Sequence, residues 1–101
     1  MAKISVIIPA YNAETTLRTA VESILSQQVP ELEIIIVDDG STKDNTAAKA
    51  DAWAARRPDV IRAIHQENAG HGGAVNTGLA AASGVYFKVV DSDDWLDAHA
   101  A

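Results

Sequence analysis

The segment LEIIIVDD, residues 32–39, has the pattern of a strand that is covered on both of its faces. Its apolar residues run on without the alternation of a half-exposed strand, and most of them are β-branched. Such strands are typical of parallel sheets, because the connecting helices cover both faces of the sheet. The segment KISVIIP (3–9) has the same pattern, and Pro9 is expected to end it, since proline cannot continue a sheet ladder.

The rest of the chain predicts two more strands, with helices between all of them. Segments 60–66 (VIRAIHQ) and 85–91 (VYFKVVD) are the further strands, and the last is interpreted as a buried core strand. A helix before Pro30 has an apolar stripe at spacings of three and four, made of Leu17, Ala20, Val21, Ile24 and Leu25. An alanine-rich helix covers 46–57, and a third helix starts near Gly73 with an apolar face of Val75, Leu79 and Ala82.

The resulting order, β-α-β-α-β-α-β, predicts an α/β fold of the Rossmann-like kind. We expect a mostly parallel sheet with helices on both of its faces, because the crossovers between parallel strands are right-handed. Ligands of such sheets bind at the carboxyl ends of the strands, so the polar residues that follow each strand are expected to converge on one edge.

The composition limits the kind of protein and the kind of partner. The chain has 101 residues and no cysteine, which allows one domain with a modest core and excludes a disulfide framework. Its net charge of −6 argues against a nucleic acid partner, because phosphate backbones bind clustered Lys and Arg. No segment is long and apolar enough to predict a membrane span, and the N-terminus is interpreted as a strand, so we expect a cytoplasmic protein.

Asp38 and Asp39 end the second predicted strand and have two interpretations. They can be simple turn formers. Alternatively, one of them faces a cleft, where a carboxylate is a good acceptor for the imino N–H of a uracil ring, while the other fastens a loop. Tyr11, which follows the first strand, is the candidate to stack on a base.

Asp91 ends the fourth predicted strand, Asp93 and Asp94 follow it, and the three are close enough to repel one another. They can be solvated caps of a further helix. The alternative is a site for Mg²⁺ or Mn²⁺, which prefer oxygen ligands and often bridge carboxylates to substrate phosphates. A cation would also let an anionic diphosphate approach this acidic chain.

The segment NAGHGGAVNTG (68–78) is either a flexible loop or a loop whose backbone passes close to a ligand. It is not the dinucleotide fingerprint, which would follow the first strand directly. His71 lies in this loop, where it can meet a ligand, but we expect it to be a solvated loop residue. His65 is expected to be structural. Lys88 either reaches water at a sheet edge or pairs with an acid.

Segments of this chain resemble the nucleotide-binding half of family 2 glycosyltransferases, in the same order and spacing. They are ISVIIPAYN, IIIVDDGSTKDNT, NAGHGGAVNTGL and GVYFKVVDSDDW, and they cover nearly the whole chain. The resemblance implies the GT-A fold, a nucleotide-sugar donor that is expected to be a UDP-sugar, and inversion at the anomeric carbon. It also implies that residues 1–101 are the nucleotide-sugar-binding half of a glycosyltransferase domain.

The resemblance assigns roles to individual residues. Asp39 resembles the acid that pairs with uracil, and the implied nucleotide-binding set is Pro9, Ala10, Tyr11, Asn12, Asp39, Asn68, Gly70, Asn76 and Ser92. The D-x-D metal motif is implied for Asp91, Asp93 and Asp94, with Asp93 expected to touch the ribose or the metal and Asp94 its rival for the metal.

The chain departs from the family pattern at several places. Val75 stands where the family often has arginine, and Lys43 looks like an additional residue in its turn. The general base of the family lies far downstream of the D-x-D motif, and no residue of this chain is assigned to that role. We therefore expect a domain truncated after its fourth strand and inactive alone. The full-length protein would be cytoplasmic, with the inner membrane face as an alternative location.

Other classes of function remain open. A sugar-phosphate nucleotidyltransferase shares the type of sheet, but it would have a glycine-rich loop with Arg or Lys after its first strand. A non-catalytic α/β module that binds a metal or a partner is the second alternative. The acceptor (a sugar, a lipid or a protein) is not indicated. If the sheet order follows the family, the fourth strand lies at an edge and we expect a homo-oligomer through it.

Overall fold

The computed structural model describes residues 4–41 and 45–90 of the chain. Strands and helices alternate along these residues, as the sequence predicted. They are β1 Ile4–Ala10, α1 Glu14–Leu25, β2 Leu32–Asp39, α2 Thr46–Arg56, β3 Ile61–Gln66, α3 Gly70–Ala81 and β4 Tyr86–Val89. None of the helices in this described part is long and apolar enough to cross a membrane.

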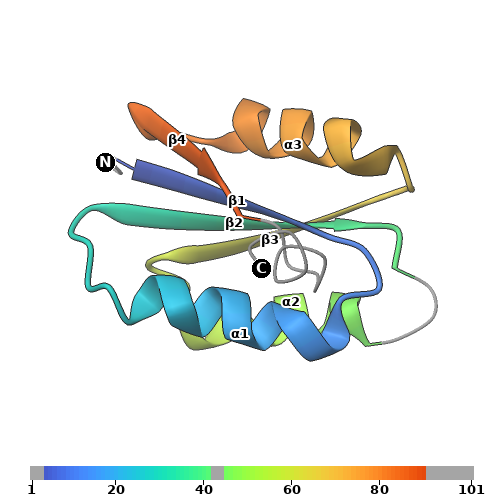
Figure 1. The fold of residues 1–101 in the computed structure, drawn as a ribbon, viewed down its shortest axis with the longest axis horizontal. Helices are drawn as coiled ribbons and strands as arrows, with labels where there is room; N and C mark the ends of the chain where they lie inside the picture. The colour runs from blue at the N-terminus through green and yellow to red at the C-terminus, as the bar shows by residue number, and fades with distance from the viewer. Residues whose placement is uncertain (1–3, 42–44, 91–101) are drawn as a thin grey trace, which may run out of the picture.

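The described strands form one parallel sheet in the order β3-β2-β1-β4. Helices α1 and α2 lie against one face of this sheet, and α3 lies against the other (Figure 1). The predicted α/β architecture with helices on both faces is therefore confirmed. The strand order runs from β1 through β2 to β3 and then returns to β4 on the other side of β1. The carboxyl ends of β1 and β4 thus mark the switch in strand order, where such sheets bind ligands.

Alternate residues of the central strands face opposite helix layers, which explains why β1 and β2 are apolar throughout. On β1, Ile8 packs in the cluster under α1 and α2, whereas Ile7 packs in the cluster under α3. Ile36 and Ile35 divide β2 in the same way, and all of these side chains are fully buried. Burying one isoleucine side chain contributes about 1.5–3 kcal/mol. The two clusters therefore hold the strand ends firmly in place.

Helix α3 buries a different face from the one predicted. Its buried residues are Ala74 and Gly78, whereas Leu79 is 39% exposed. A Cβ added to Gly78 would overlap Cγ2 of Ile7, so only very small residues fit where the helix crosses β1. The sequence predicted an apolar face of Val75, Leu79 and Ala82 for this helix. That prediction was wrong for Leu79, the largest of the three side chains.

Strand β1 continues through Pro9 to Ala10, beyond its predicted end. Pro9 stays in register with Val37 of β2. The backbone N–H and C=O groups of residues two apart on a strand point toward the same neighbouring strand. The Ile7 carbonyl accepts a hydrogen bond of 2.9 Å from the N–H of Val90, which directly follows β4. The missing N–H of Pro9 therefore lies on the β4 side. The proline limits the ladder toward β4 and leaves the ladder toward β2 intact.

Strand β4 is an exposed edge strand, so the edge position expected from the family is confirmed and the interpretation of a buried core strand was wrong. Tyr86 is 62% exposed and Phe87 is 52% exposed, and in the described part of the chain β4 pairs with β1 alone. Apolar composition predicts a strand, but it does not say whether another element covers that strand. The side chain of Lys88 is also exposed on this edge, in agreement with the first of its two interpretations.

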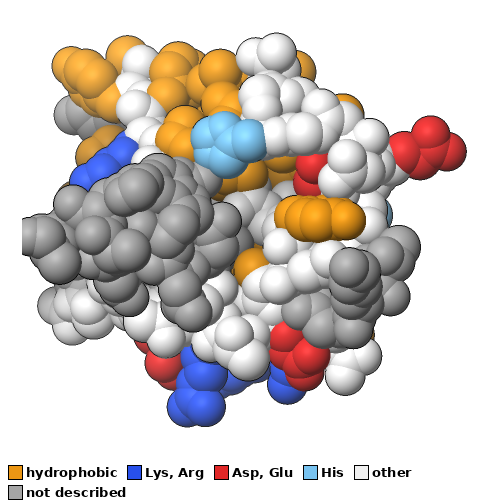
Figure 2. All heavy atoms as spheres, turned by 45° about the vertical axis from the view of Figure 1, so that its right-hand side comes forward, with side chains coloured by type: hydrophobic (Ala, Val, Ile, Leu, Met, Phe, Trp, Pro, Cys, Tyr) orange, Lys and Arg blue, Asp and Glu red, His pale blue; other side chains and the backbone are white. Residues whose placement is uncertain are grey.

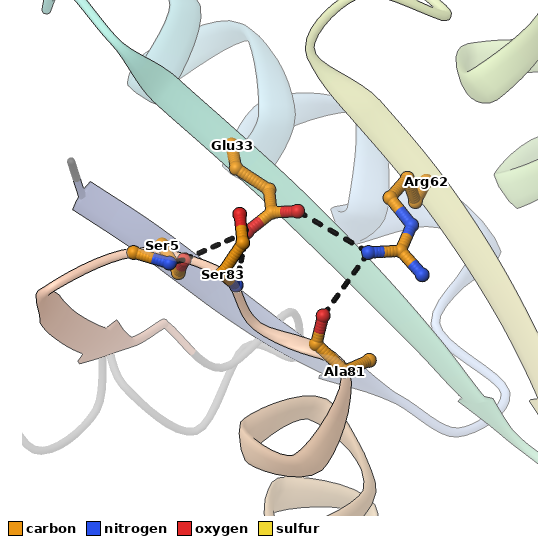
Figure 3. A network of polar contacts seen from close by, with 6 residues as sticks. Ser5, Glu33, Arg62, Ala81 and Ser83 are labelled. Atoms are coloured by element: carbon orange, nitrogen blue, oxygen red, sulfur yellow. Dashed lines mark hydrogen bonds and ion pairs between the residues drawn. The ribbon is translucent and has the colours of Figure 1, made fainter. Parts of the chain in front are cut away.

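A buried carboxylate fastens the connection between α3 and β4 near the amino ends of β1 and β2 (Figure 3). Glu33 Oε2 accepts hydrogen bonds from Ser5 Oγ at 2.8 Å and from the backbone N–H of Ser83 at 2.9 Å, and Glu33 Oε1 pairs with Arg62 at 3.2 Å. Burial alone would raise the pKa of Glu33, but the hydrogen bonds from Ser83, Ser5 and Arg62 hold it below its usual value. These contacts set where β4 begins beside β1.

Candidate functional site

The carboxyl ends of β1 and β2 and the amino end of α3 surround a hollow of about 230 Å³. This edge is turned toward the viewer in Figure 2, where hydrophobic, histidine and acidic side chains gather. The residues that line the hollow are Pro9, Ala10, Tyr11, Asp39, Asn68, Gly70, His71 and Ala74. They come from segments far apart in the sequence, and the strand order brings them together.

Larger hollows, of about 380 to 600 Å³, lie elsewhere on the described surface. The largest of these lies over α1 and α2, where its walls are exposed helix residues such as Arg18, Lys49 and Arg56. The others lie near the amino ends of β2 and β3. None of them joins the loops that follow several strands, so chemistry rather than size places the candidate site in the smaller hollow.

The carboxylate of Asp39 is surrounded by donors from the loop after β3. Its Oδ1 accepts hydrogen bonds from Gln66 Nε2 at 2.9 Å and from the Ala69 N–H at 2.8 Å. Its Oδ2 accepts from the Gly70 N–H at 3.0 Å and from Asn68 Nδ2 at 3.3 Å. Asp39 is 3% exposed, and these contacts stabilise its buried charge.

The same contacts explain why α3 begins at Gly70 rather than near Gly73 as predicted. Asp39 supplies, from another strand, the side-chain cap that the helix lacks at its own N-cap residue. Gly40 allows the loop to come this close. Its φ is +75°, and a Cβ there would lie 2.7 Å from the backbone nitrogen of Asn68. The loop after β3 is thereby fastened to the turn after β2.

The loop after β1 is fastened to the segment around the start of α2 by two hydroxyl groups. The N–H of Asn12, whose φ is +49°, donates to Ser41 Oγ at 2.9 Å. The next N–H, from Ala13, donates to Thr46 Oγ1 at 2.7 Å. Tyr11 lies just before these anchors and is 49% exposed, so its ring is accessible at the hollow.

Asp38 faces the opposite side of the sheet from Asp39, as successive strand residues do. Its Oδ2 lies 2.9 Å from Nδ1 of His65, and Nε2 of His65 lies 2.7 Å from Asp51 of α2. These two carboxylates raise the pKa of His65, and burial opposes them. Burial alone would raise the pKa of Asp38, but hydrogen bonds from Ser41 and His65 hold it below its usual value. His65 thus ties β3 to β2 and to α2.

Most of the predicted nucleotide-binding residues in the described part of the chain meet at the hollow. Those that line it are Pro9, Ala10, Tyr11, Asp39, Asn68 and Gly70. Asn12 lies beside it in the loop after β1, whereas Asn76 lies farther along α3, exposed and outside the lining. His71 also lines the hollow, and it is exposed there, as the solvated interpretation predicted. A prediction that α3 starts at Gly70 would have placed His71 in the first turn of that helix.

The predicted metal ligands Asp91, Asp93 and Asp94, together with Ser92, lie outside the described residues. Within 4–41 and 45–90, no group of three or more His, Asp and Glu side chains could hold a metal ion. The last described residue is Val90, which is hydrogen bonded to β1 close to the hollow's edge of the sheet. The acids follow it directly in the sequence.

Residues 5–100 match the family model described as Glycosyl transferase family 2. The chain belongs to glycosyl transferase family 2. This membership argues against the sugar-phosphate nucleotidyltransferase that the sequence left open, and it confirms the family that the four segments resembled.

Proteins named as glycosyltransferases in two bacteria align with most of the chain. The uncharacterized glycosyltransferase YibD of Escherichia coli (strain K12) is 49% identical over 92 residues, which cover 91% of this chain and 26% of that protein. The putative glycosyltransferase EpsH of Bacillus subtilis (strain 168) is 40% identical over 94 residues, which cover 93% of this chain and 27% of that protein. The chain therefore spans about a quarter of the length of these relatives.

Solved structures of two other proteins superpose on most of the chain. The mannosyltransferase PcManGT from Pyrobaculum calidifontis, in complex with GDP-Man and Mn²⁺, superposes with a TM-score of 0.82 at 32% identity, covering 90% of this chain and 27% of that one. S. aureus TarS 1–349 in complex with UDP-GlcNAc gives 0.78 at 32% identity, covering 97% and 30%. The described residues therefore have the GT-A, Rossmann-like fold.

Proposed function

We propose that residues 1–101 form the nucleotide-sugar-binding half of a glycosyltransferase domain, with the nucleotide in the hollow at the carboxyl edge. The observation that carries this proposal is the convergence of the segments after β1, β2 and β3 on one hollow, beside the switch in strand order, in a family 2 chain. PcManGT and TarS were solved with GDP-Man and UDP-GlcNAc, which supports a nucleotide-sugar as the class of donor.

The base of the donor, proposed to be uracil, would lie between Tyr11 and Asp39. The accessible ring of Tyr11 can stack on it. The carboxylate of Asp39 would accept its imino N–H, but a carboxylate has about four lone-pair sites and this one already has several donors. The longest of these contacts, at 3.3 Å, comes from the side chain of Asn68. We expect the base to displace that side chain and to leave the backbone donors in place.

A divalent cation, Mn²⁺ or Mg²⁺, is proposed to bind at Asp91, Asp93 and Asp94. A set of carboxylate oxygens fits these hard cations. The chain carries a net charge of −6, and a donor diphosphate is anionic as well. When bound, the cation would offset the negative charge of the diphosphate. Asp91, Asp93 and Asp94 would hold the cation, and the cation would supply the positive charge that a donor diphosphate needs.

Calorimetric titration with UDP tests the proposal. Mn²⁺ should tighten the binding of UDP, and Asp93→Ala should remove most of that gain. Asp59→Ala is the matched control, because Asp59 is an exposed acid near the amino ends of the strands and its loss should leave the gain unchanged. Equal affinity for UDP with and without Mn²⁺ would contradict the proposed metal-dependent site.

The complete reaction that we propose is transfer of a sugar from a UDP-sugar to an acceptor hydroxyl, with inversion at the anomeric carbon. No described residue is assigned as the general base, and such a base contributes about 10²- to 10⁴-fold to the rate. The 101-residue chain alone is therefore expected to be inactive. Transfer of sugar to an acceptor by the purified chain, detected by mass spectrometry, would contradict this expectation. Slow hydrolysis of the donor would not.

A further inference from the structure

A line of hydrogen bonds runs from the surface of α2 to the loop after β1. Asp51 Oδ1 lies 2.7 Å from Nε2 of His65, and Nδ1 of His65 lies 2.9 Å from Asp38 Oδ2. The other oxygen of Asp38 accepts the N–H of Ser41 at 3.0 Å, and Ser41 Oγ accepts the N–H of Asn12 at 2.9 Å. The line therefore connects α2, β3 and β2 to the loop that borders the hollow.

Both nitrogens of the His65 ring face carboxylate oxygens, and both donate when these carboxylates are ionised. Ionised carboxylates can only accept hydrogen bonds, and a neutral imidazole has a single N–H. Both nitrogens lie within hydrogen-bond distance of a carboxylate oxygen, so the arrangement fits the imidazolium form. Among the described residues, the charged groups that act on His65 are Asp38 of β2 and Asp51 of α2.

Asn12 lies at the end of this line of hydrogen bonds, and its backbone conformation has to be stabilised by its neighbours. Asn12 has a φ of +49°, in the left-handed region that residues other than glycine adopt only at a cost. Its N–H is fixed by Ser41, and Ser41 is fixed in turn by Asp38. Asp38 is 4% exposed, so a change in its partners cannot readily be compensated by water.

We propose that His65 is a positioning residue for the donor nucleotide: as an imidazolium it orients Asp38, which holds Ser41 and the Asn12 backbone at the border of the hollow. A neutral ring keeps at most one of its two contacts, and that contact loses its charge assistance. The loop after β1 is then less firmly held, and the nucleotide binds more weakly. This inference rests on the proposed function, because it takes the hollow to be the nucleotide site.

Titration with UDP and Mg²⁺ between about pH 6 and pH 8.5, the window in which histidine changes charge, tests the inference. The affinity of the wild-type chain should fall as the pH rises through the pKa of His65. Asp51→Asn removes a charge that raises this pKa, so the fall should begin at lower pH while the affinity at the acidic end is kept. Asp59→Asn is the matched control, with 69% exposure against 66% for Asp51, and it should behave as the wild type.

His65→Gln should lose this part of the pH dependence. It should bind UDP about three- to tenfold more weakly at the acidic end, the range expected when one hydrogen bond's net contribution is lost. NMR spectra of the unliganded chain give a second readout. The amide resonances of Ser41 and Asn12 should follow the titration of the His65 ring, with a lower midpoint in Asp51→Asn.

Two results would overturn the inference alone while UDP still binds. One is a pH profile of affinity that is the same in the wild type, Asp51→Asn and His65→Gln. The other is a pair of amide resonances, from Ser41 and Asn12, that stay constant while the ring of His65 titrates. A wild-type chain that binds no UDP at any pH would instead overturn the proposed function, and this inference with it.

Discussion

Asp39 organises the candidate site at the scale of a single side chain. It accepts hydrogen bonds from the backbone of Ala69 and Gly70 and from the side chains of Gln66 and Asn68. Its donors lie 27 to 31 positions away along the chain, so no local pattern could have predicted them. The Asp39 carboxylate therefore fixes the first turn of α3 in the chain without a bound nucleotide.

Asp39→Asn should destabilise the chain without changing the size of the side chain. One oxygen becomes an NH₂ group that faces N–H donors, so at least one buried hydrogen bond is lost, at a cost of about 1–3 kcal/mol. Urea unfolding measures the change in the free energy of unfolding. Asp59→Asn, at an exposed acid, should change that free energy by less than about 0.5 kcal/mol. An Asp39→Asn chain as stable as the wild type would contradict the assigned role.

Helix α3 packs closely against the sheet because it has no side chain at Gly78. It crosses the sheet so closely that the side-chain position of Gly78 is already filled by Ile7. Gly72, in the same helix, has no neighbouring atoms within 4 Å of an added Cβ. The helix is thus closely packed at Gly78 and open at Gly72.

Alanine at these two glycines should change the stability in opposite directions. Gly72→Ala should stabilise the chain by up to about 1 kcal/mol, because alanine favours helices over glycine. Gly78→Ala should destabilise it by about 1–3 kcal/mol, because the added methyl group overpacks the contact with Ile7. Thermal and urea unfolding measure both. A stabilising effect of Gly78→Ala would contradict the close approach of α3 to β1.

The elements differ in how well the sequence predicted them, for physical reasons. Strand β2 has the bounds predicted from LEIIIVDD, because a strand buried on both faces leaves an unbroken apolar run. The start and buried face of α3 were missed, because an Ala- and Gly-rich helix has little contrast between its faces and its cap comes from Asp39. The exposure of β4 depends on which strands neighbour it, and its own residues do not indicate that.

At the scale of the whole molecule, the β4 edge is the main exposed apolar surface in the described part of the chain. The exposed large hydrophobic residues Val85, Tyr86, Phe87 and Val89 lie in or next to this strand. An exposed apolar edge presents unpaired backbone groups that can pair with a second chain. We therefore propose that the chain self-associates through this edge.

Val89→Lys should make the chain more monomeric if the edge is responsible, because a charge on an edge strand opposes pairing. Leu79→Lys is the matched control. Val89 is 40% exposed on the edge, and Leu79 is 39% exposed on α3, so the two apolar side chains are matched in exposure. Light scattering at high protein concentration measures the molar mass. A wild-type chain that stays monomeric would contradict the proposed association. A stronger effect of Leu79→Lys would indicate that the contact lies on α3.

The central claim is that the nucleotide binds at the carboxyl edge of the sheet, beside the switch in strand order. Backbone amide NMR spectra recorded during a titration with UDP and Mg²⁺ test it most directly. We predict that the largest shifts fall on Ala10, Tyr11, Gly70 and His71, and that amides near the amino ends of the strands, such as Glu31 and Asp59, stay unchanged. Largest shifts near those amino ends, or over the outer surfaces of α1 and α2, would contradict the claim.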